Sequence, residues 1–213
     1  MALLFLESFD HASLEDKWTA VSAGAFGAIT RSLVGRRGTT GLRMRTTSPS
    51  VAAETGTVSL TPDMPLVSGV RMLVGFALQV VEPFVGLAAT TDETGNVLWS
   101  MRLGGVTQLW CRVLPTGRLS IYRGSTLLGR TSVEIQRGVY HYVEFDVLSD
   151  LAVGTVNVFV NGRNVLSLVG RDTCASGSVG WDEIRLGTIR SDGTQVVEVN
   201  IDDFYLADGS GAD

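Results

Sequence analysis

Residues 140–168 read YHYVEFDVLSDLAVGTVNVFVNGRNVLSL, a stretch that alternates and turns like consecutive strands of an antiparallel sheet. Successive side chains of a strand point to opposite faces. Over 140–148 one face is apolar and the other polar: Val143, Phe145 and Val147 against Tyr140, Tyr142, Glu144 and Asp146. The next strand ends at Asn161-Gly162, which predicts a tight hairpin because both residues tolerate the positive φ of a type I′ turn. We expect the return strand to begin at Val165.

The rest of the chain repeats this pattern. Residues 109–113 alternate inward and outward side chains, 115–117 turn the chain, and 119–121 resume the inward face. Residues 73–81 form a longer apolar run, which predicts a strand buried on both faces. Roughly a dozen such segments, separated by turn residues, predict an all-β chain folded as a two-sheet antiparallel sandwich. We expect one domain over 1–207 and a flexible tail over 208–213.

Composition narrows the class of protein. The 213 residues are 45% apolar and 18% charged, which excludes disorder and fits a chain that buries a sizeable core. The net charge of −5 argues against nucleic acid as a partner. No run reaches the ~20 apolar residues of a membrane span, and the first residues lack a cleavable leader. We therefore expect no membrane partner, synthesis in the cytoplasm, and free thiols at Cys111 and Cys174.

The order of motifs late in the chain resembles the concanavalin A-like jelly rolls, in particular laminin G-like domains. The residues that carry the resemblance are GVYHYVEFDVL, GTVNVFVNGRNV, IRLGTI and NIDDFYLAD, within 138–208. The resemblance implies a concanavalin A-like jelly-roll sandwich in which the last strand pairs beside the first. It implies little about function, because this sandwich carries lectins, hydrolases and structural modules.

A second resemblance concerns the two ends of the chain. A start of the form LLFxESFD and an end of the form IDDFYLxD, with no leader, are similar to bacteriophage virion proteins of the head-decoration or tail type. This resemblance implies a structural or accessory protein of a phage particle, located in the virion and made in the host cytoplasm. Its partners would be further copies of itself, as a homo-oligomer, and a capsid or tail protein.

Catalytic arrangements are incomplete in the sequence. Laminarinase-like glucanases share the fold and use a strand motif Glu-x-Asp-x-x-Glu; Glu144 and Asp146 match two positions, but Asp150 is displaced and shorter than Glu. Of the two histidines, we expect His11 at an exposed turn and His141 packed inside. The expectation is a protein without enzymatic activity.

Asp202 and Asp203 stand between Ile201 and Phe204, which are an odd number of residues apart. If both apolar side chains point inward, the strand must bulge at the aspartates. One carboxylate would then accept backbone N–H groups of the bulge or of a neighbouring turn. One alternative is a calcium site, although calcium needs 6 to 8 oxygen ligands and this pair supplies only part of them. The other alternative is a catalytic pair of carboxylates.

The candidate binding face is the outward side of the 108–123 hairpin. Its residues are Trp110, Arg112, Arg118 and Tyr122, and Tyr140 and Tyr142 add to it. Aromatic and arginine side chains are typical of protein interfaces, and exposed aromatics beside polar groups are typical of glycan sites. Interior packing is the third interpretation. The expected function is a non-catalytic phage structural protein acting through protein contacts. The first alternative is a carbohydrate-binding module or tail adhesin, and the second is a glucan hydrolase.

Overall fold

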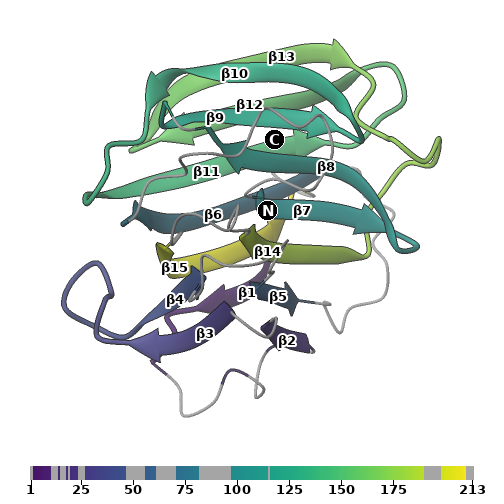
Figure 1. The fold of residues 1–213 in the computed structure, drawn as a ribbon. Helices are drawn as coiled ribbons and strands as arrows, with labels where there is room; N and C mark the ends of the chain where they lie inside the picture. Colours follow the sequence, from purple (N-terminus) through teal and green to yellow (C-terminus); the bar gives the residue numbers. More distant parts are fainter. Residues whose placement is uncertain are drawn as a thin grey trace.

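The computed structural model describes residues 2–10, 14, 18, 20–23, 27–46, 56–60, 71–81, 97–114, 116–189 and 198–209. These residues form strands and no helix, arranged as two antiparallel sheets packed face to face (Figure 1). The all-β, two-sheet prediction is confirmed. Across the described ranges, no helix has the length and apolar character needed to cross a membrane.

The larger sheet contains eight strands in the order β13-β12-β11-β6-β15-β4-β3, with β1 paired to β15. Their bounds are β1 Ala2–Glu7, β3 Gly27–Ser32, β4 Gly41–Thr46, β6 Arg71–Val80, β11 Tyr140–Leu148, β12 Gly154–Val160, β13 Arg163–Arg171 and β15 Glu198–Asp208. The smaller sheet contains seven strands in the order β10-β9-β8-β7-β14-β5-β2. Their bounds are β2 Ala20–Ala23, β5 Gly56–Leu60, β7 Val97–Leu103, β8 Val106–Val113, β9 Arg118–Arg123, β10 Thr126–Glu134 and β14 Glu183–Ile189.

The hairpin between β12 and β13 has the predicted turn. Asn161 and Gly162 have φ values of 51° and 77°, and Val160 pairs with Arg163 across the two-residue loop. The return strand thus begins two residues before Val165. On β11 the apolar set Val143, Phe145 and Val147 is buried as expected.

The closing strand β15 has two different neighbours on one side. Its first half, Glu198–Ile201, pairs with β4, and its second half, Phe204–Asp208, pairs with β1. The first and last strands therefore pair, as the jelly-roll resemblance implied. The strand includes Asp208, the first residue of the expected tail, and Gly209 donates its N–H to the Arg71 carbonyl at 2.8 Å. Residues 210–213 lie outside the described part.

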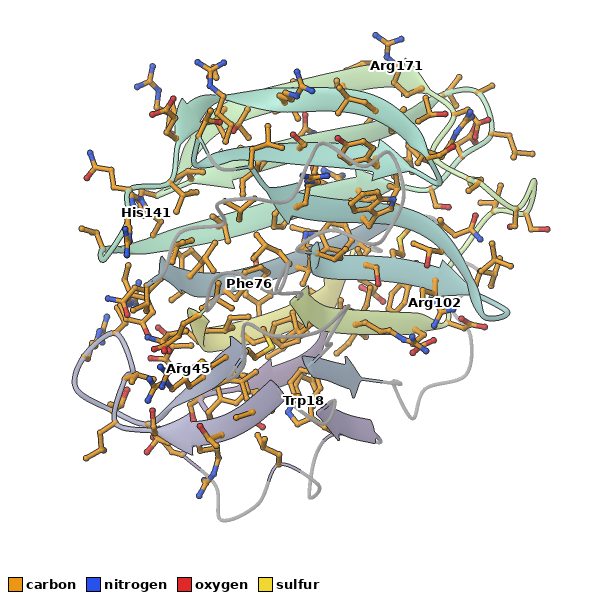
Figure 2. The ribbon with its side chains drawn as sticks, viewed as in Figure 1. Trp18, Arg45, Phe76, Arg102, His141 and Arg171 are labelled. Carbon is orange, nitrogen blue, oxygen red and sulfur yellow. The ribbon has the colours of Figure 1, made fainter. Side chains whose placement is uncertain are left out.

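The core lies between the two sheets. Phe76 of β6 stacks against Phe145 and Phe204, with ring centroids 6.1 and 6.3 Å apart, and Figure 2 shows it between the layers. Trp18 adds a second aromatic group by packing against Phe5 and Phe204. Cys111 and Cys174 are both free and both buried, so the expectation of two unbridged thiols is confirmed.

Candidate functional site

The outer face of the eight-stranded sheet carries one continuous row of residues that runs across six strands. Each member lies directly opposite the next in the strand register, so all of them point to the same face. We call it the central row: Leu6 on β1, Tyr205 on β15, Gly75 on β6, Glu144 on β11, Phe159 on β12 and Asn164 on β13. With strands ~4.8 Å apart, the row is about 24 Å long.

Tyr205, Gly75 and Glu144 form the centre of this row. A Cβ atom on Gly75 would lie 2.2 Å from Cε1 of Tyr205, which shows that the phenol ring lies across the bare backbone of β6. The Tyr205 hydroxyl then donates a hydrogen bond to Oε1 of Glu144 at 2.8 Å, two strands away. A half-buried ring laid along the sheet, beside a carboxylate, presents an apolar surface next to a hydrogen-bond acceptor.

Two more tyrosines flank the row on β11. The Tyr142 ring lies under the Arg36 guanidinium, whose central carbon is 5.5 Å from the ring centroid. The Tyr140 hydroxyl donates to the Val34 carbonyl. Both contacts come from the segment between β3 and β4, which therefore forms one border of the face.

The Asp202-Asp203 pair is a bulge, as predicted from the odd spacing. The register between β15 and β6 shifts between Asp202 and Tyr205, and Asp203 adopts a positive φ of 49°. The buried Asp202 carboxylate accepts the backbone N–H of Arg36 at 2.9 Å and that of Asp203 at 2.9 Å. Asp203 forms an ion pair with Arg36 at 3.0 Å. The carboxylates thus join the bulge to the β3–β4 segment.

This arrangement leaves calcium with a poor set of ligands. Asp202 already accepts backbone N–H groups, and Asp203 already faces a cation. In the part of the chain that the structure describes, no group of three histidine, cysteine or carboxylate side chains could hold a metal ion. The structure therefore supports the bulge interpretation of the aspartates.

The tyrosine hydroxyls of this face are held in their protonated form. Burial, followed by the charges of Glu144 and Asp203, raises the pKa of Tyr142 to about 12. The pKa of Tyr140 is raised by burial and then by the charges of Asp202 and Asp203. The pKa of Tyr205 is raised by burial and then by Glu144. At neutral pH these groups are hydrogen-bond donors that also keep lone pairs for acceptance.

The three carboxylates compared with a glucanase motif take separate roles. Glu144 accepts from Tyr205, whereas Asp146 is held by Arg71 through two bonds of 2.7 and 2.8 Å. The Arg71 hydrogen bonds lower the pKa of Asp146 despite its burial. Asp150 accepts the N–H groups of Ala152 and Val153 and so shapes a turn instead of joining the strand pair.

His141 is buried and hydrogen-bonded, as the sequence predicted. Its Nε2 accepts the Gln136 N–H at 3.0 Å, and its Nδ1 lies 3.3 Å from the Asn161 side-chain amide. Figure 2 shows it near the start of β11. His11 lies outside the described residues.

The predicted binding residues of the 108–123 hairpin do not form an exposed face. Trp110, Arg112 and Tyr122 are buried, whereas Arg118 is exposed and pairs with Glu134 at 3.7 Å. The Trp110 and Tyr122 rings stack with centroids 4.3 Å apart, and the indole N–H donates to the Gly124 carbonyl at 2.6 Å. Packing, one of the three interpretations, therefore describes this group. The alternation of the sequence predicted which face of the strand these side chains occupy, but it could not predict that this face is covered.

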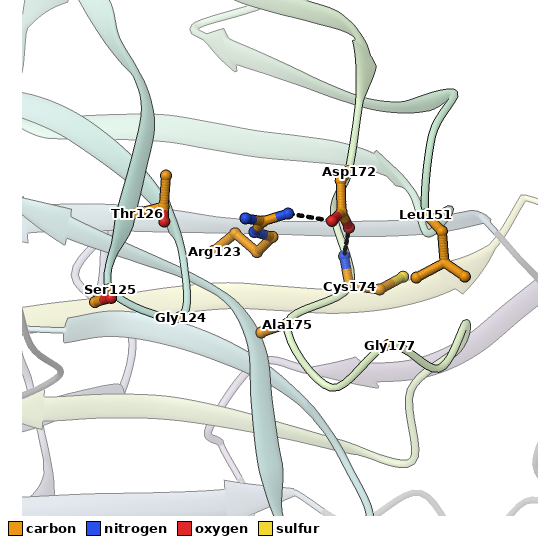
Figure 3. A pocket seen from close by; sticks show the side chains of 9 residues that line it. All are labelled: Arg123, Gly124, Ser125, Thr126, Leu151, Asp172, Cys174, Ala175 and Gly177. Atoms are coloured by element: carbon orange, nitrogen blue, oxygen red, sulfur yellow. Dashed lines mark hydrogen bonds and ion pairs between the residues drawn. The ribbon is translucent and has the colours of Figure 1, made fainter.

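A second candidate is a hollow of about 380 Å³ between the β9–β10 turn and the segment after β13 (Figure 3). Arg123 is the cation among its described lining residues, and it already pairs with Asp172. Asp172 also accepts the Cys174 N–H at 2.9 Å, and the Cys174 sulfur lies 3.2 Å from the Ser149 hydroxyl. The two charged groups of this hollow are thus engaged with each other, and its thiol is engaged with Ser149, which makes the hollow the weaker candidate.

Neither a scan against protein-family models nor a search of curated proteins gives a match. Solved structures do match over nearly the whole chain. An endo-β-1,4-glucuronan lyase from the fungus Trichoderma reesei superposes with a TM-score of 0.67 at 15% identity, covering 96% of this chain and 94% of that one. The alginate lyase Aly36B gives a TM-score of 0.55 at 12% identity, covering 96% of each chain.

A third structure has the same architecture and no assigned activity. It is a Bacillus subtilis protein of unknown function with a galectin-like fold, with a TM-score of 0.62 at 11% identity over 98% of this chain and 96% of that one. The chain folds as a jelly-roll sandwich. At these identities the likeness establishes the fold alone.

The comparison contradicts the expectation that the protein is not an enzyme. That expectation rested on incomplete carboxylate motifs. It took the absence of a glucanase motif to mean the absence of any catalytic activity. Two polysaccharide lyases have the same sandwich fold over nearly the whole length of this chain. The comparisons give no sign of a phage origin.

Sequence reasoning missed Tyr205, Gly75 and Phe159. A signal for Tyr205 was available, because a bulge that turns Phe204 inward necessarily turns Tyr205 outward. The sequence contains no comparable signal for Gly75 and Phe159, because their role in the row depends on which strands become neighbours.

Proposed function

We propose that the protein binds a polysaccharide along the central row on the outer face of its eight-stranded sheet. The observation that carries this proposal is the Tyr205 ring lying across Gly75 with its hydroxyl on Glu144. An apolar ring face beside fixed hydrogen-bonding groups suits sugars, which have apolar C–H faces and polar hydroxyl edges.

The length of the row supports a chain-like ligand. Leu6, Tyr205 and Phe159 place apolar or aromatic side chains on β1, β15 and β12, so the contacts extend across most of the sheet. A row of about 24 Å offers room for several consecutive sugar units. The names of the glucuronan and alginate lyases of the same fold identify enzymes that act on polysaccharides, which supports the class of ligand proposed.

Glycan binding takes the place of the phage structural role as the main proposal. Self-association and contact with a capsid or tail protein stay predictions. The pair Trp110 and Tyr122 is unsuited to testing them, because both rings are packed inside and their removal would disturb the fold.

The test compares binding by the wild-type protein with that of Tyr205→Ala and Phe159→Ala, using affinity electrophoresis and calorimetry against a panel of soluble polysaccharides. We expect each substitution to weaken binding by about tenfold or more, equivalent to about 1.4 kcal/mol. Val169→Ala is the matched control, because it removes an exposed apolar side chain from β13 away from the row.

Circular dichroism and melting curves establish that every variant is folded. The same mixtures are assayed for newly released sugar ends, so that cleavage is detected where it occurs. If the wild-type protein binds no polysaccharide, or if the row variants bind as well as Val169→Ala, the proposal is wrong.

A further inference from the structure

Charged side chains border the central row, and several of them are already paired with one another. Arg36 is engaged with Asp203 at 3.0 Å, and Arg71 is engaged with Asp146 at 2.7 Å. The charges of Arg36 and Arg71 are therefore balanced by carboxylates of the same face. An incoming anion would have to compete with these partners.

Glu144 is different, because it lies in the row itself. Its hydrogen-bond partner is the neutral Tyr205 hydroxyl, and within the described residues no arginine or lysine forms an ion pair with it. The centre of the row thus presents a carboxylate, which accepts hydrogen bonds and donates none. Sugar hydroxyls are donors that such a group can bind, and a sugar carboxylate is not.

Resting on the proposed polysaccharide function, we infer that the central row takes an uncharged polysaccharide and rejects polyuronates. A polyuronate carries a carboxylate on each sugar unit. Laid along about 24 Å of sheet, it would set negative charges against Glu144, and like charges repel one another. To an uncharged chain, the same surface offers a hydrogen-bond acceptor between apolar side chains.

The state of the tyrosines agrees with this. Carboxylate charge contributes, after burial, to the raised pKa of Tyr140, Tyr142 and Tyr205, so three separate hydroxyls sense a negative environment. Their protonated hydroxyls can both donate to and accept from sugar hydroxyls.

The experiment uses three sets of probes on the full chain: uncharged xyloglucan, galactomannan and hydroxyethyl cellulose; acidic alginate and polyglucuronate; and cationic chitosan oligosaccharides. Binding is measured by affinity electrophoresis at low and moderate salt. We expect retardation by at least one uncharged polymer, little dependence of that binding on salt, and no binding of the acidic polymers.

Glu144→Gln removes the charge and keeps the size. We expect it to bind the acidic polymers at least tenfold better than the wild-type protein, while its affinity for the uncharged ligand falls. Glu134→Gln is the matched control, since it removes one exposed negative charge from β10, outside the row, and is expected to leave the preference unchanged.

The outcomes separate the two proposals. If the wild-type protein binds alginate or polyglucuronate better than any uncharged polymer, or binds only chitosan, the inferred ligand class is wrong. Sensitivity of that binding to Tyr205→Ala would then still support polysaccharide binding. If no probe of any class binds, the proposed function itself is wrong.

Discussion

Gly75 is the residue on which the geometry of the central row depends. It lies on β6 between Glu144 of β11 and Tyr205 of β15, and it is the absence of a side chain that lets the ring lie over the backbone. The space above a central strand is usually filled by that strand's own residue. Here it is filled by a side chain from the neighbouring strand, which brings a hydroxyl to a carboxylate two strands away.

We therefore predict that Gly75→Ala displaces the Tyr205 ring. The new methyl group would lie 2.2 Å from Cε1 and 2.8 Å from Cζ, so the ring must move and its bond to Glu144 is lost. Overpacking of this kind costs about 1–3 kcal/mol in the free energy of unfolding. Chemical denaturation measures the loss, and polysaccharide binding should weaken in parallel.

The control is the double variant Gly75→Ala with Tyr205→Ala. If the clash is the cause, removing the ring should recover most of the stability lost in the single variant, which a double-mutant cycle quantifies. Additive losses would mean that the two residues act independently, and the described packing would be wrong.

At the scale of elements, the hairpin after β12 is tied to the start of β11 through His141 and Asn161. Asn161 turns the chain with a positive φ, and its side-chain carbonyl accepts the Tyr142 N–H at 2.8 Å. Its amide lies against His141, whose other nitrogen accepts from Gln136. The turn, the strand start and the preceding loop therefore share one hydrogen-bonded group.

This group predicts a pH dependence of stability. Burial lowers the pKa of His141, and the Gln136 N–H needs the lone pair on Nε2, so the folded state favours neutral histidine. The unfolded chain takes up the proton first as the pH falls through about 6.5. The stabilising contribution is therefore present above that pH and is lost on acidification.

Melting temperatures measured between pH 7.5 and 5.5 test this. The wild-type protein should lose stability toward pH 5.5, and His141→Gln should show a shallower dependence. His11→Gln, which leaves His141 in place, is the control and should keep the wild-type slope. Equal slopes in wild type and His141→Gln would contradict the assignment.

At the scale of the whole molecule, the two thiols report on the integrity of the sandwich. Cys111 lies in the core between the sheets, where burial raises its pKa well above the ordinary range. Cys174 is 3% exposed and contacts Ser149. Buried thiols react slowly, so labelling requires the protein to open.

We predict that alkylation without reductant labels two cysteines in denaturant and neither in the native protein over the same time. Mass spectrometry distinguishes these states. A protein two mass units lighter that takes no label after unfolding would contain a disulfide and would contradict the structure. Rapid labelling of Cys174 alone would show that the hollow beside it opens locally.

Much of the fold followed from local chemistry. Alternation along 140–148 assigned the faces of β11, Asn161-Gly162 specified a turn that needs positive φ, and the odd spacing around Asp202-Asp203 required a bulge. Each of these depends on a few consecutive residues, whose steric preferences act within the chain itself.

The site depended on which strands became neighbours. Five residues of the central row are scattered over about 200 residues of sequence: Leu6, Gly75, Glu144, Phe159 and Tyr205. They meet only because their strands lie side by side in register, in the order β1, β15, β6, β11 and β12. Alternation could say that Trp110 leaves the core face of its strand, but burial depends on what covers that face. Cross-strand register and coverage are set by packing between distant segments, so only the three-dimensional structure reveals them.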